Sequence, residues 1–352
     1  MSGAKPLRIG MVTWDYDPPI GGMGRHVSSL QSGFESLDHT VSVFSRSDIR
    51  FPFGRSILFS LLLPLLLPRW IKRFSPDLLH VHAGPGGVFL LRKPALLPLM
   101  VTANHTYHDQ VRCVGQRWKR LLVPLERRTY ALADHILCLS EDTAHSLLHD
   151  YGIDRSKLSV VPCGIDVARF SALDRPLRDR GKRCVFVGRS DARKGFDLLL
   201  HAWPLVLRTI PDATLHAVGI GSDFSLPLPP AVVLHPACTD DELAELLGSS
   251  RVSVCPSRLE GFGLAAAEAI ASGTPVVATD VPGLRTTVTN FETGLLTSMN
   301  PHDIASTLVS LLQDDVLWHR FHVGCQRRRL RFDVKLEIQK HLEVYRVYTD
   351  IR

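Results

Sequence analysis

The stretch RVSVCPSRLEGFGLAAAEAIASGTPVVATD, residues 251–280, decides the fold. It begins as a short apolar strand and leaves that strand through a loop containing Gly-Phe-Gly. A run of strong helix formers follows, which Gly273 and Pro275 stop before a second apolar strand begins. Strands that alternate with helices in this way predict a parallel sheet with right-handed crossovers.

The same alternation fills the chain and restarts once. We therefore predict an α/β protein of two doubly wound, Rossmann-like domains that face each other across a cleft, where ligands bind beyond the carboxyl ends of the strands. The expected strands lie within 8–14, 78–84, 97–104, 135–140 and 158–164, and again within 184–190, 213–221, 232–236, 251–257 and 275–280. The expected domains are 1–168 and 183–330, with a polar linker at 169–182 and a helical segment at 331–352.

Composition narrows the class of protein. The 352 residues are 45% apolar and 22% charged, as in a globular protein, and the net charge of +6 suits an anionic partner. Seven cysteines, an odd number without C-x-x-C spacing, predict neither a disulfide framework nor a zinc site. With no signal-like N-terminus, we expect a cytoplasmic protein.

The leucine-rich segment 56–74 departs from this average. It is too short for a membrane span, which takes about 20 apolar residues, and Pro64 and Pro68 are expected to interrupt it. Its apolar face, followed by Trp70 and basic residues, predicts either an anchor on an anionic membrane surface, with peripheral attachment at the inner face of the cytoplasmic membrane, or a buried helix or subunit contact. Further basic residues recur at Arg112, Arg117, Lys119, Arg120, Arg127 and Arg128.

Two glutamates stand eight positions apart in the deciding stretch. Glu260 lies in the loop and Glu268 in the helix; if both were helical they would be about 12 Å apart. A hydrolytic carboxylate pair is separated by roughly 5–9.5 Å, so the two acids suit opposite ends of an elongated ligand better. The helix N-terminus between them, with Gly261 and Gly263, is suited to an anion. A nucleotide sugar has this form; the alternative for Glu268 is a solvated surface residue.

Two further loops carry residues suited to such a ligand. Arg189 stands at the end of the strand at 184–190 and Lys194 follows it. The two would neutralise a diphosphate without a metal, unless they form an ordinary basic loop. Gly21 and Gly22 follow the first strand, where backbone can approach a phosphate or sugar. The dinucleotide fingerprint is absent, since Phe224 replaces its third glycine, and this weakens a dehydrogenase interpretation.

Histidines raise a separate possibility. His105 and His108 follow a strand, and either could donate a hydrogen bond or carry a proton. His80 and His82 share one face of a strand and could complete a four-histidine metal site. No carboxylate or thiolate spacing reinforces such a site, so we expect no metal and no cofactor.

These elements together resemble the family-4 retaining glycosyltransferases, which have the GT-B architecture. The resemblance runs over nearly the whole chain, and its most specific part is the E-x7-E motif at 260–268. The sequence departs from the family pattern at Cys163, where the family usually has asparagine, and near Pro236, where the family usually has glycine. The matching stretches are GGMGRHV (21–27), VTANH (101–105), LSEDTA (139–144), VVPCGID (160–166), VGRSDARKG (187–195) and PSRLEGFGLAAAEAIASGTPVVATD (256–280).

The resemblance implies a role for each matching residue. It implies that Glu260 contacts the transferred sugar, Glu268 the ribose, and Arg189 and Lys194 the diphosphate. It places the backbone N–H groups of Gly22, Gly263 and Leu264 near phosphate or sugar, and His105 near the reacting sugar. It also implies a same-face displacement without an essential metal, and a C-terminal helix that crosses back onto the first domain.

The leading hypothesis is a retaining transfer of a hexose from a UDP- or GDP-linked sugar to a lipid-linked or glycan acceptor. A nucleotide-sugar epimerase with the same fold is the alternative, and a non-catalytic scaffold is a third. Nucleic acid is not expected as a partner.

Overall fold

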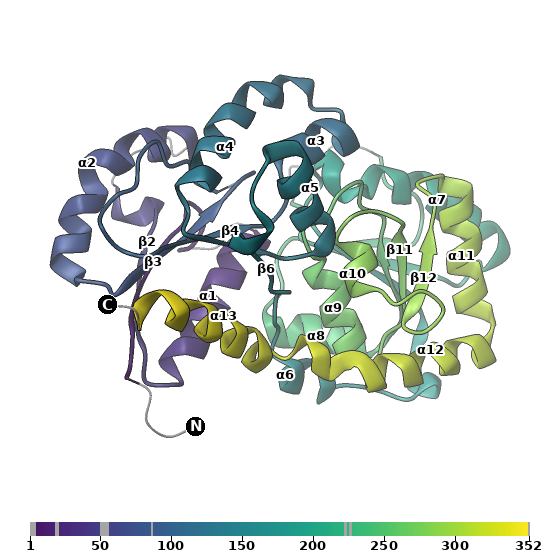
Figure 1. Cartoon of the computed structure of the whole chain (residues 1–352). Helices are drawn as coiled ribbons and strands as arrows, with labels where there is room; N and C mark the ends of the chain where they lie inside the picture. Colours follow the sequence, from purple (N-terminus) through teal and green to yellow (C-terminus); the bar gives the residue numbers. More distant parts are fainter. Residues whose placement is uncertain are drawn as a thin grey trace. The chain divides into compact units, whose positions relative to one another are not determined.

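The computed structural model describes residues 5–17, 21–49, 56–85, 87–221, 224 and 227–350. The chain divides into two compact units (Figure 1). The first is formed by Met1–Gly164 together with Val334–Arg352, and the second by Ile165–Asp333. Each unit is described by itself.

The first unit is built on a six-stranded parallel sheet in the order β2-β1-β3-β4-β5-β6. Its central pairings place Ile9 of β1 opposite Val41 of β2 and Leu78 of β3. The strands are β1 (Arg8–Val12), β2 (Thr40–Phe44), β3 (Leu78–Ala83), β4 (Leu99–Ala103), β5 (His135–Cys138) and β6 (Leu158–Val160). The helices are α1 (Gly22–Glu35), α2 (Ser56–Phe74), α3 (Tyr107–Val114), α4 (Val123–Leu132), α5 (Glu141–Tyr151) and α13 (Val334–Thr349), with a 3-10 helix η2 (Arg117–Leu122).

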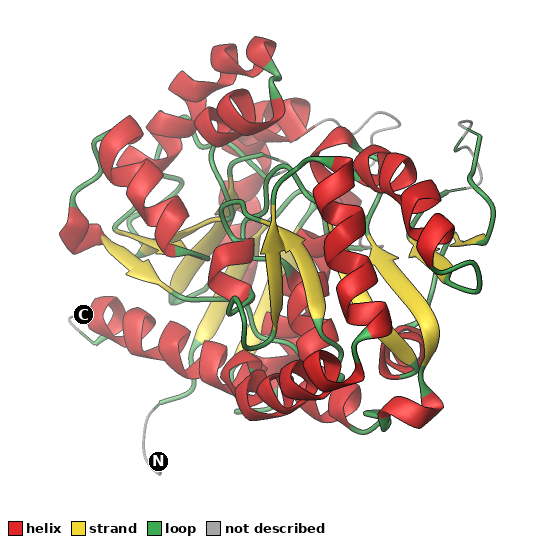
Figure 2. Ribbon diagram, turned by 90° about the vertical axis from the view of Figure 1, so that its right-hand side faces the viewer, coloured by secondary structure: helices red, strands yellow, loops and turns green. Residues whose placement is uncertain are grey.

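The second unit repeats this design with the sheet order β12-β11-β10-β7-β8-β9. Figure 2 shows its strands lying between layers of helices. The strands are β7 (Gly181–Val187), β8 (Thr214–Val218), β9 (Val232–His235), β10 (Ser250–Cys255), β11 (Val276–Thr279) and β12 (Gly294–Thr297). The helices are α6 (Val167–Ser171), α7 (Phe196–Thr209), α8 (Asp240–Gly248), α9 (Leu264–Ala271), α10 (Leu284–Thr287), α11 (Pro301–Gln313) and α12 (Asp315–Arg328), with a 3-10 helix η5 (Ala192–Lys194).

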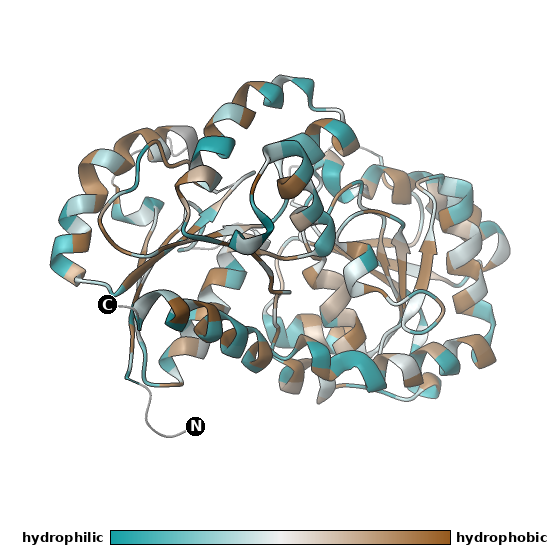
Figure 3. Cartoon of the chain, viewed as in Figure 1, coloured by the Kyte–Doolittle hydropathy of each residue, from teal (hydrophilic) through white to brown (hydrophobic). Residues whose placement is uncertain are grey.

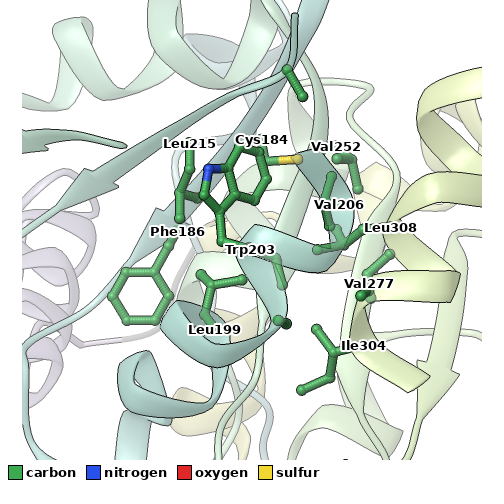
Figure 4. Close-up of a cluster of buried hydrophobic side chains, with 14 of the residues drawn as sticks. Cys184, Phe186, Leu199, Trp203, Val206, Leu215, Val252, Val277, Ile304 and Leu308 are labelled. Atoms are coloured by element: carbon green, nitrogen blue, oxygen red, sulfur yellow. The ribbon is translucent and has the colours of Figure 1, made fainter. Parts of the chain in front are cut away.

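Burial explains why these segments are strands and helices. In Figure 3 the strands are mostly hydrophobic, while the helices alternate hydrophobic and hydrophilic residues. Parallel strands covered on both faces need continuous apolar runs, whereas covering helices need only one apolar face. In the second unit Trp203 of α7 is fully buried with Phe186, Leu215 and Ile304 (Figure 4). The prediction of two doubly wound α/β units is confirmed.

The order of the strands determines where each sheet opens. In the second unit β7 is the first strand along the chain, and its neighbours are β8 on one side and β10 on the other. The loops after β7 and β10 therefore lead to helices on opposite faces of the sheet, and in doubly wound folds the crevice at such a point is where ligands bind. In the first unit the equivalent point lies between β1 and β3.

The segment 169–182, which the sequence predicts as a linker, belongs to the second unit. Arg180 is buried there and donates hydrogen bonds to the carbonyls of Ser250 (2.8 Å) and Ser272 (3.0 Å). Its guanidinium also pairs with Asp174 at 2.9 Å. These bonds attach the start of the second unit to its own sheet.

Helix α2 passes through both prolines that we expected to interrupt it, Pro64 and Pro68. Leu63 and Leu67 lie one turn apart on its buried face and pack into the core of the first unit. The apolar face of 56–74 is therefore used in part by the fold, as the buried-helix alternative predicted.

Trp70, which we considered as a membrane anchor, is partly buried in the same core. Its ring lies 5.7 Å from that of Phe44 and stacks on Phe74 at 5.4 Å. Over the described part of the chain, no helix combines the length and apolarity needed to cross a membrane.

Candidate functional site

The candidate site of the second unit lies where the loops after β7 and β10 meet. Arg258 N donates to the carbonyl of Arg193 at 2.7 Å, and the Arg193 guanidinium donates to the carbonyl of Leu259 at 3.1 Å. The Arg258 guanidinium forms two bonds to the Asp197 carboxylate, at 2.8 and 2.6 Å. Because backbone and side-chain bonds both join the loops, residues of one loop hold fixed positions against the other.

Gly195 allows this close approach. Its φ of +69° is in the left-handed region, and a Cβ there would lie 1.9 Å from the carbonyl oxygen of Pro256. Any side chain would push the two loops apart, because the obstacle is backbone rather than a flexible side chain.

Glu260 stands at the centre of this junction. Its carboxylate accepts hydrogen bonds from Lys194 Nζ (2.7 Å), the Arg193 guanidinium (3.0 Å) and Ser257 Oγ (2.8 Å), and the residue is only 8% exposed. Burial raises the pKa of Glu260, but the charges of Lys194 and Arg193 outweigh it and hold the pKa at about 2. The carboxylate is therefore ionised at neutral pH and paired with two cations.

Helix α9 begins four residues after Glu260. Gly263 precedes it with a φ of +97°, and a Cβ there would come within 2.8 Å of Leu284 Cδ2. No side chain forms a capping hydrogen bond at this helix start, which Leu264 opens. The backbone N–H groups of a helix start attract anions, so Gly263 and Leu264 offer a place for a negatively charged group beside Glu260.

Glu268 lies on the same helix and is buried, with 4% of its surface exposed. The alternative of a solvated surface glutamate therefore does not describe it. The pKa of Cys255, at the end of β10, reports the charges of both acids. Burial raises this pKa most, the charge of Glu260 raises it further, and the charge of Glu268 adds a smaller effect, to about 12 in all. Both acids of the E-x7-E motif thus belong to one buried region of the second unit.

The two predicted cations of this site have different surroundings. Lys194 ends η5 and contacts Glu260, whereas Arg189 is more than half exposed and pairs with Asp191 at 3.2 Å. That both cations face a diphosphate stays a prediction. The structure adds that Lys194 already has a carboxylate partner within its own unit.

The remaining predicted residues belong to the first unit. Gly21 precedes α1 and Gly22 opens it. The carboxylate of Asp15 accepts hydrogen bonds from the N–H groups of Gly21 (2.9 Å) and Gly24 (3.2 Å). An acidic side chain therefore sits where the sequence predicts a bound phosphate or sugar, and a hydroxyl donor is better matched to this position than a phosphate.

His105 follows β4 and is buried, with 8% exposed. Its Nε2 lies 3.0 Å from the amide nitrogen of Gln110, which can only donate, so Nε2 accepts and the ring proton is placed on Nδ1. The same loop lies against a buried acid: burial raises the pKa of Glu126 to about 8, and the N–H of Tyr107 donates to its carboxyl group at 2.9 Å.

The described structure does not bring His80, His82, His105 and His108 together into the metal site that the sequence left open. His80 Nε2 bonds to Thr102 Oγ1 and its Nδ1 to the Tyr345 hydroxyl, both at 2.6 Å. His108 instead packs edge-on against Tyr151, with 5.3 Å between ring centroids. Among the residues that the structure describes, these four histidines do not form a group able to share one metal ion.

Sequence reasoning missed three residues of these sites: Arg193, Ser257 and Asp15. Arg193 and Ser257 adjoin motif residues, and the strand order that places the two loops side by side is the signal that could have found them. Asp15 lies in the loop after β1, ahead of the Gly-Gly pair. No spacing pattern in the sequence predicts that its carboxylate bonds to the start of α1.

Family models match both halves of the chain. A model described as Glycosyltransferase Family 4 matches residues 20–169, and one described as Glycosyl transferases group 1 matches residues 181–314.

Individual proteins agree with the models. A D-inositol 3-phosphate glycosyltransferase of Streptomyces bingchenggensis is 32% identical, over 94% of this chain and 87% of that protein. A glycogen synthase of Mycobacterium tuberculosis is 28% identical, over 93% of this chain and 91% of that protein. Both similarities therefore extend over the two units.

Solved structures share the fold. Sucrose-phosphate synthase from Thermosynechococcus elongatus superposes with a TM-score of 0.82 at 20% identity, covering 98% of this chain and 100% of that one. Anabaena Alr3699/HepE in complex with UDP-glucose gives 0.72 at 17% identity, covering 96% and 99%. This chain therefore has the GT-B fold.

The ion cluster around Glu260 predicts a specific dependence of stability on pH. Since its folded pKa of about 2 lies below the unfolded value of about 4.3, the carboxylate stabilises the fold above about pH 4.3, and this contribution is lost as the pH falls toward 2. Glu260→Gln should lower the free energy of unfolding at pH 7 by on the order of 3 kcal/mol, because two partly buried cations lose their partner. The difference should shrink between about pH 4.3 and pH 2, as measured by denaturant unfolding.

Glu245→Gln is the matched control for this measurement. Glu245 pairs with Arg175 on the surface of the same unit, where an ion pair contributes at most about 1 kcal/mol. A Glu260→Gln deficit that stays constant from pH 7 to pH 2 would show that Glu260 is not an ionised partner of these cations.

Proposed function

Because the chain belongs to the family-4 glycosyltransferases, we propose that it transfers a hexose from a nucleotide diphosphate sugar, UDP- or GDP-linked, to a lipid-linked or glycan acceptor, with retention of the anomeric configuration. One observation carries the proposal. An ionised glutamate, Glu260, lies at the crevice of the second sheet beside the uncapped start of α9. A sugar hydroxyl and an anionic diphosphate would find matching partners there.

The donor would bind along the line from Glu260 to Glu268. We assign the N–H groups of Gly263 and Leu264, with Arg189 and Lys194, to the diphosphate, because a helix start and two cations oppose its negative charge. Glu268 would accept a hydrogen bond from the ribose, and Glu260 one from the transferred sugar. The complex of Alr3699/HepE with UDP-glucose supports a uridine nucleotide as the first donor to test.

The reaction would need neither a metal nor a cofactor. Positive charge from Arg189 and Lys194 would stabilise the leaving diphosphate as the bond between the anomeric carbon and the phosphate oxygen breaks. In a same-face displacement the acceptor oxygen bonds to the anomeric carbon, and its proton passes to the departing phosphate oxygen. His105 would donate its Nδ1 proton to a hydroxyl of the reacting sugar, and Gly21 and Gly22 would line the sugar or acceptor.

The first unit offers a binding place for an anionic acceptor. A cavity of about 800 Å³ opens beside His108 in this unit, and four of its lining residues are arginines from the basic set noted in the sequence. Such a surface suits a phosphorylated or lipid-linked acceptor. These four are Arg112, Arg117, Arg120 and Arg127.

The epimerase alternative has no observation in its favour. The two relatives described above are named a glycosyltransferase and a glycogen synthase, and one of the solved structures is named a sucrose-phosphate synthase.

Glu260→Gln tests the proposed function. The neutral amide keeps the size of the side chain but is a weaker acceptor for the hydrogen bond from the transferred sugar, and it leaves Lys194 and Arg193 without their carboxylate partner, so kcat should fall at least about 100-fold. Glu245→Gln should retain wild-type turnover. The assay would use UDP- and GDP-hexoses with a lipid-linked or glycan acceptor, would be repeated with EDTA, and would determine the anomer of the product.

Full turnover by Glu260→Gln would remove this residue from the reaction. An inverted product, or an activity lost in EDTA by a chain whose circular dichroism is unchanged, would contradict the retaining, metal-independent chemistry. An epimerised donor without consumption of acceptor would instead establish the alternative.

Peripheral membrane attachment is the second part of the proposal. Leu61 and Leu65 lie one turn apart on the outer face of α2 and are 57% and 68% exposed. Three exposed basic residues follow at the end of the helix: Arg69, Lys72 and Arg73. An apolar ridge beside positive charge suits an anionic leaflet of the cytoplasmic membrane.

Flotation with liposomes tests this attachment. The wild-type chain should float with anionic vesicles and less so with neutral ones, and added salt should weaken binding. The double variant Leu61→Gln, Leu65→Gln should bind severalfold less, whereas Leu330→Gln, which changes an exposed leucine of the second unit, should bind as the wild type does. Equal flotation with anionic and neutral vesicles would contradict the attachment.

A further inference from the structure

A buried cluster of polar side chains joins three segments of the first unit. His26 comes from α1, Cys163 from the loop after β6, and Glu337 from α13; each is at most 3% exposed. His26 Nε2 lies 2.5 Å from one oxygen of Glu337, and the other oxygen accepts the N–H of Gly164 at 2.7 Å. In Figure 1 the two helices lie side by side.

The three side chains present one ligand atom each at a common point. The imidazole nitrogen, the sulfur and the carboxylate oxygen all lie within 4.8 Å of one another, and over the described residues no other such group of His, Cys, Asp and Glu is found. Imidazole, thiolate and carboxylate are the ligands that zinc takes in proteins, with bonds of about 2.0–2.3 Å. A metal at their centre needs only small shifts of these atoms.

A second observation points to a ligand at this place. His82 of β3 is fully buried, and neither of its ring nitrogens has a hydrogen-bond partner in the described structure. Its ring centroid lies 5.7 Å from that of His26, whose Nδ1 also has no partner. Buried imidazoles are rarely left without partners, because each must donate or accept at two nitrogens.

We propose that His26, Cys163, Glu337 and His82 form a closed structural site for a divalent transition metal, with zinc the best match. His26, Cys163 and Glu337 supply three of the four ligands that structural zinc sites require. The His82 ring lies beside that of His26 but outside this group, so it would turn toward the metal to supply the fourth. Binding would replace the protons of the thiol and of the His26–Glu337 pair, so metal uptake would release protons. The site would fasten α13 to α1 and to the loop that follows β6.

This site is separate from the proposed donor site. Its residues lie in the first unit, whereas Glu260 and Glu268 lie in the second, and the inference does not rest on the proposed function. The competing interpretation is a hydrogen-bonded network of thiol, imidazole and carboxylate that holds no metal.

Cobalt substitution separates these interpretations. Full-length chain freed of metal by a chelator would be titrated with Co²⁺ and then with Zn²⁺. The proposal predicts one equivalent of Co²⁺, with thiolate-to-cobalt charge-transfer absorption and the intense visible bands of tetrahedral Co²⁺, displaced by one equivalent of Zn²⁺. Absence of stoichiometric binding, or binding without thiolate absorption, would overturn it, and this result needs no variant.

Two cysteine variants locate the metal. Cys163→Ala should abolish the thiolate absorption and weaken affinity by more than about 100-fold, since even the loss of a partner behind a ligand costs about 10–100-fold. Cys138→Ala, which changes another buried free cysteine of the same unit, should keep the absorption and the affinity. Circular dichroism would confirm folding, and a Cys163→Ala chain that binds Co²⁺ as the wild type does would overturn the assignment.

His82→Phe tests the fourth ligand. It should retain the thiolate absorption but lower affinity at least about tenfold and change the visible bands, because one nitrogen leaves the coordination sphere. Unchanged bands and affinity would exclude His82 from the site.

Discussion

The candidate donor site depends on the contact between the loops that follow β7 and β10. These strands are neighbours in the sheet, but their loops lead to helices on opposite faces of it. Ligands of doubly wound folds bind at such a point. The backbone bond from Arg258 to Arg193 and the absence of a side chain at Gly195 hold the loops together. The buried ion cluster of Glu260 can form only because this contact places Lys194 and Arg193 beside it.

That cluster explains how a carboxylate is kept ionised in a largely buried position. Burial alone would favour the protonated acid, but two cations and the hydroxyl of Ser257 reverse the balance. The same arrangement brings positive charge and the N–H groups at the start of α9 to one place. Bonds within the unit hold these groups in place, and such preorganisation is the condition for strong electrostatic stabilisation of the departing diphosphate that we propose.

Much of this could be predicted from the sequence, because the decisive signals are local. Alternating apolar strands and helices predicted the two α/β units, and the E-x7-E stretch predicted a strand, a loop and a helix that carry both acids. Contacts between distant segments could not be predicted. The pairing of Lys194 with Glu260, the capping of α1 by Asp15, and the meeting of His26, Cys163 and Glu337 each need the third dimension. The cysteine count and spacing predicted no zinc site, and the metal site that we propose has ligands from distant segments, which spacing along the chain does not register.

Hydrogen–deuterium exchange with saturating UDP and GDP would test the central claim most directly, namely that the crevice between β7 and β10 binds the nucleotide diphosphate. We expect one of the two nucleotides to slow exchange in peptides covering 188–195 and 256–268, and Glu268→Ala to weaken this protection. Protection by neither nucleotide, or protection that spares both segments, would contradict the assignment of the donor site.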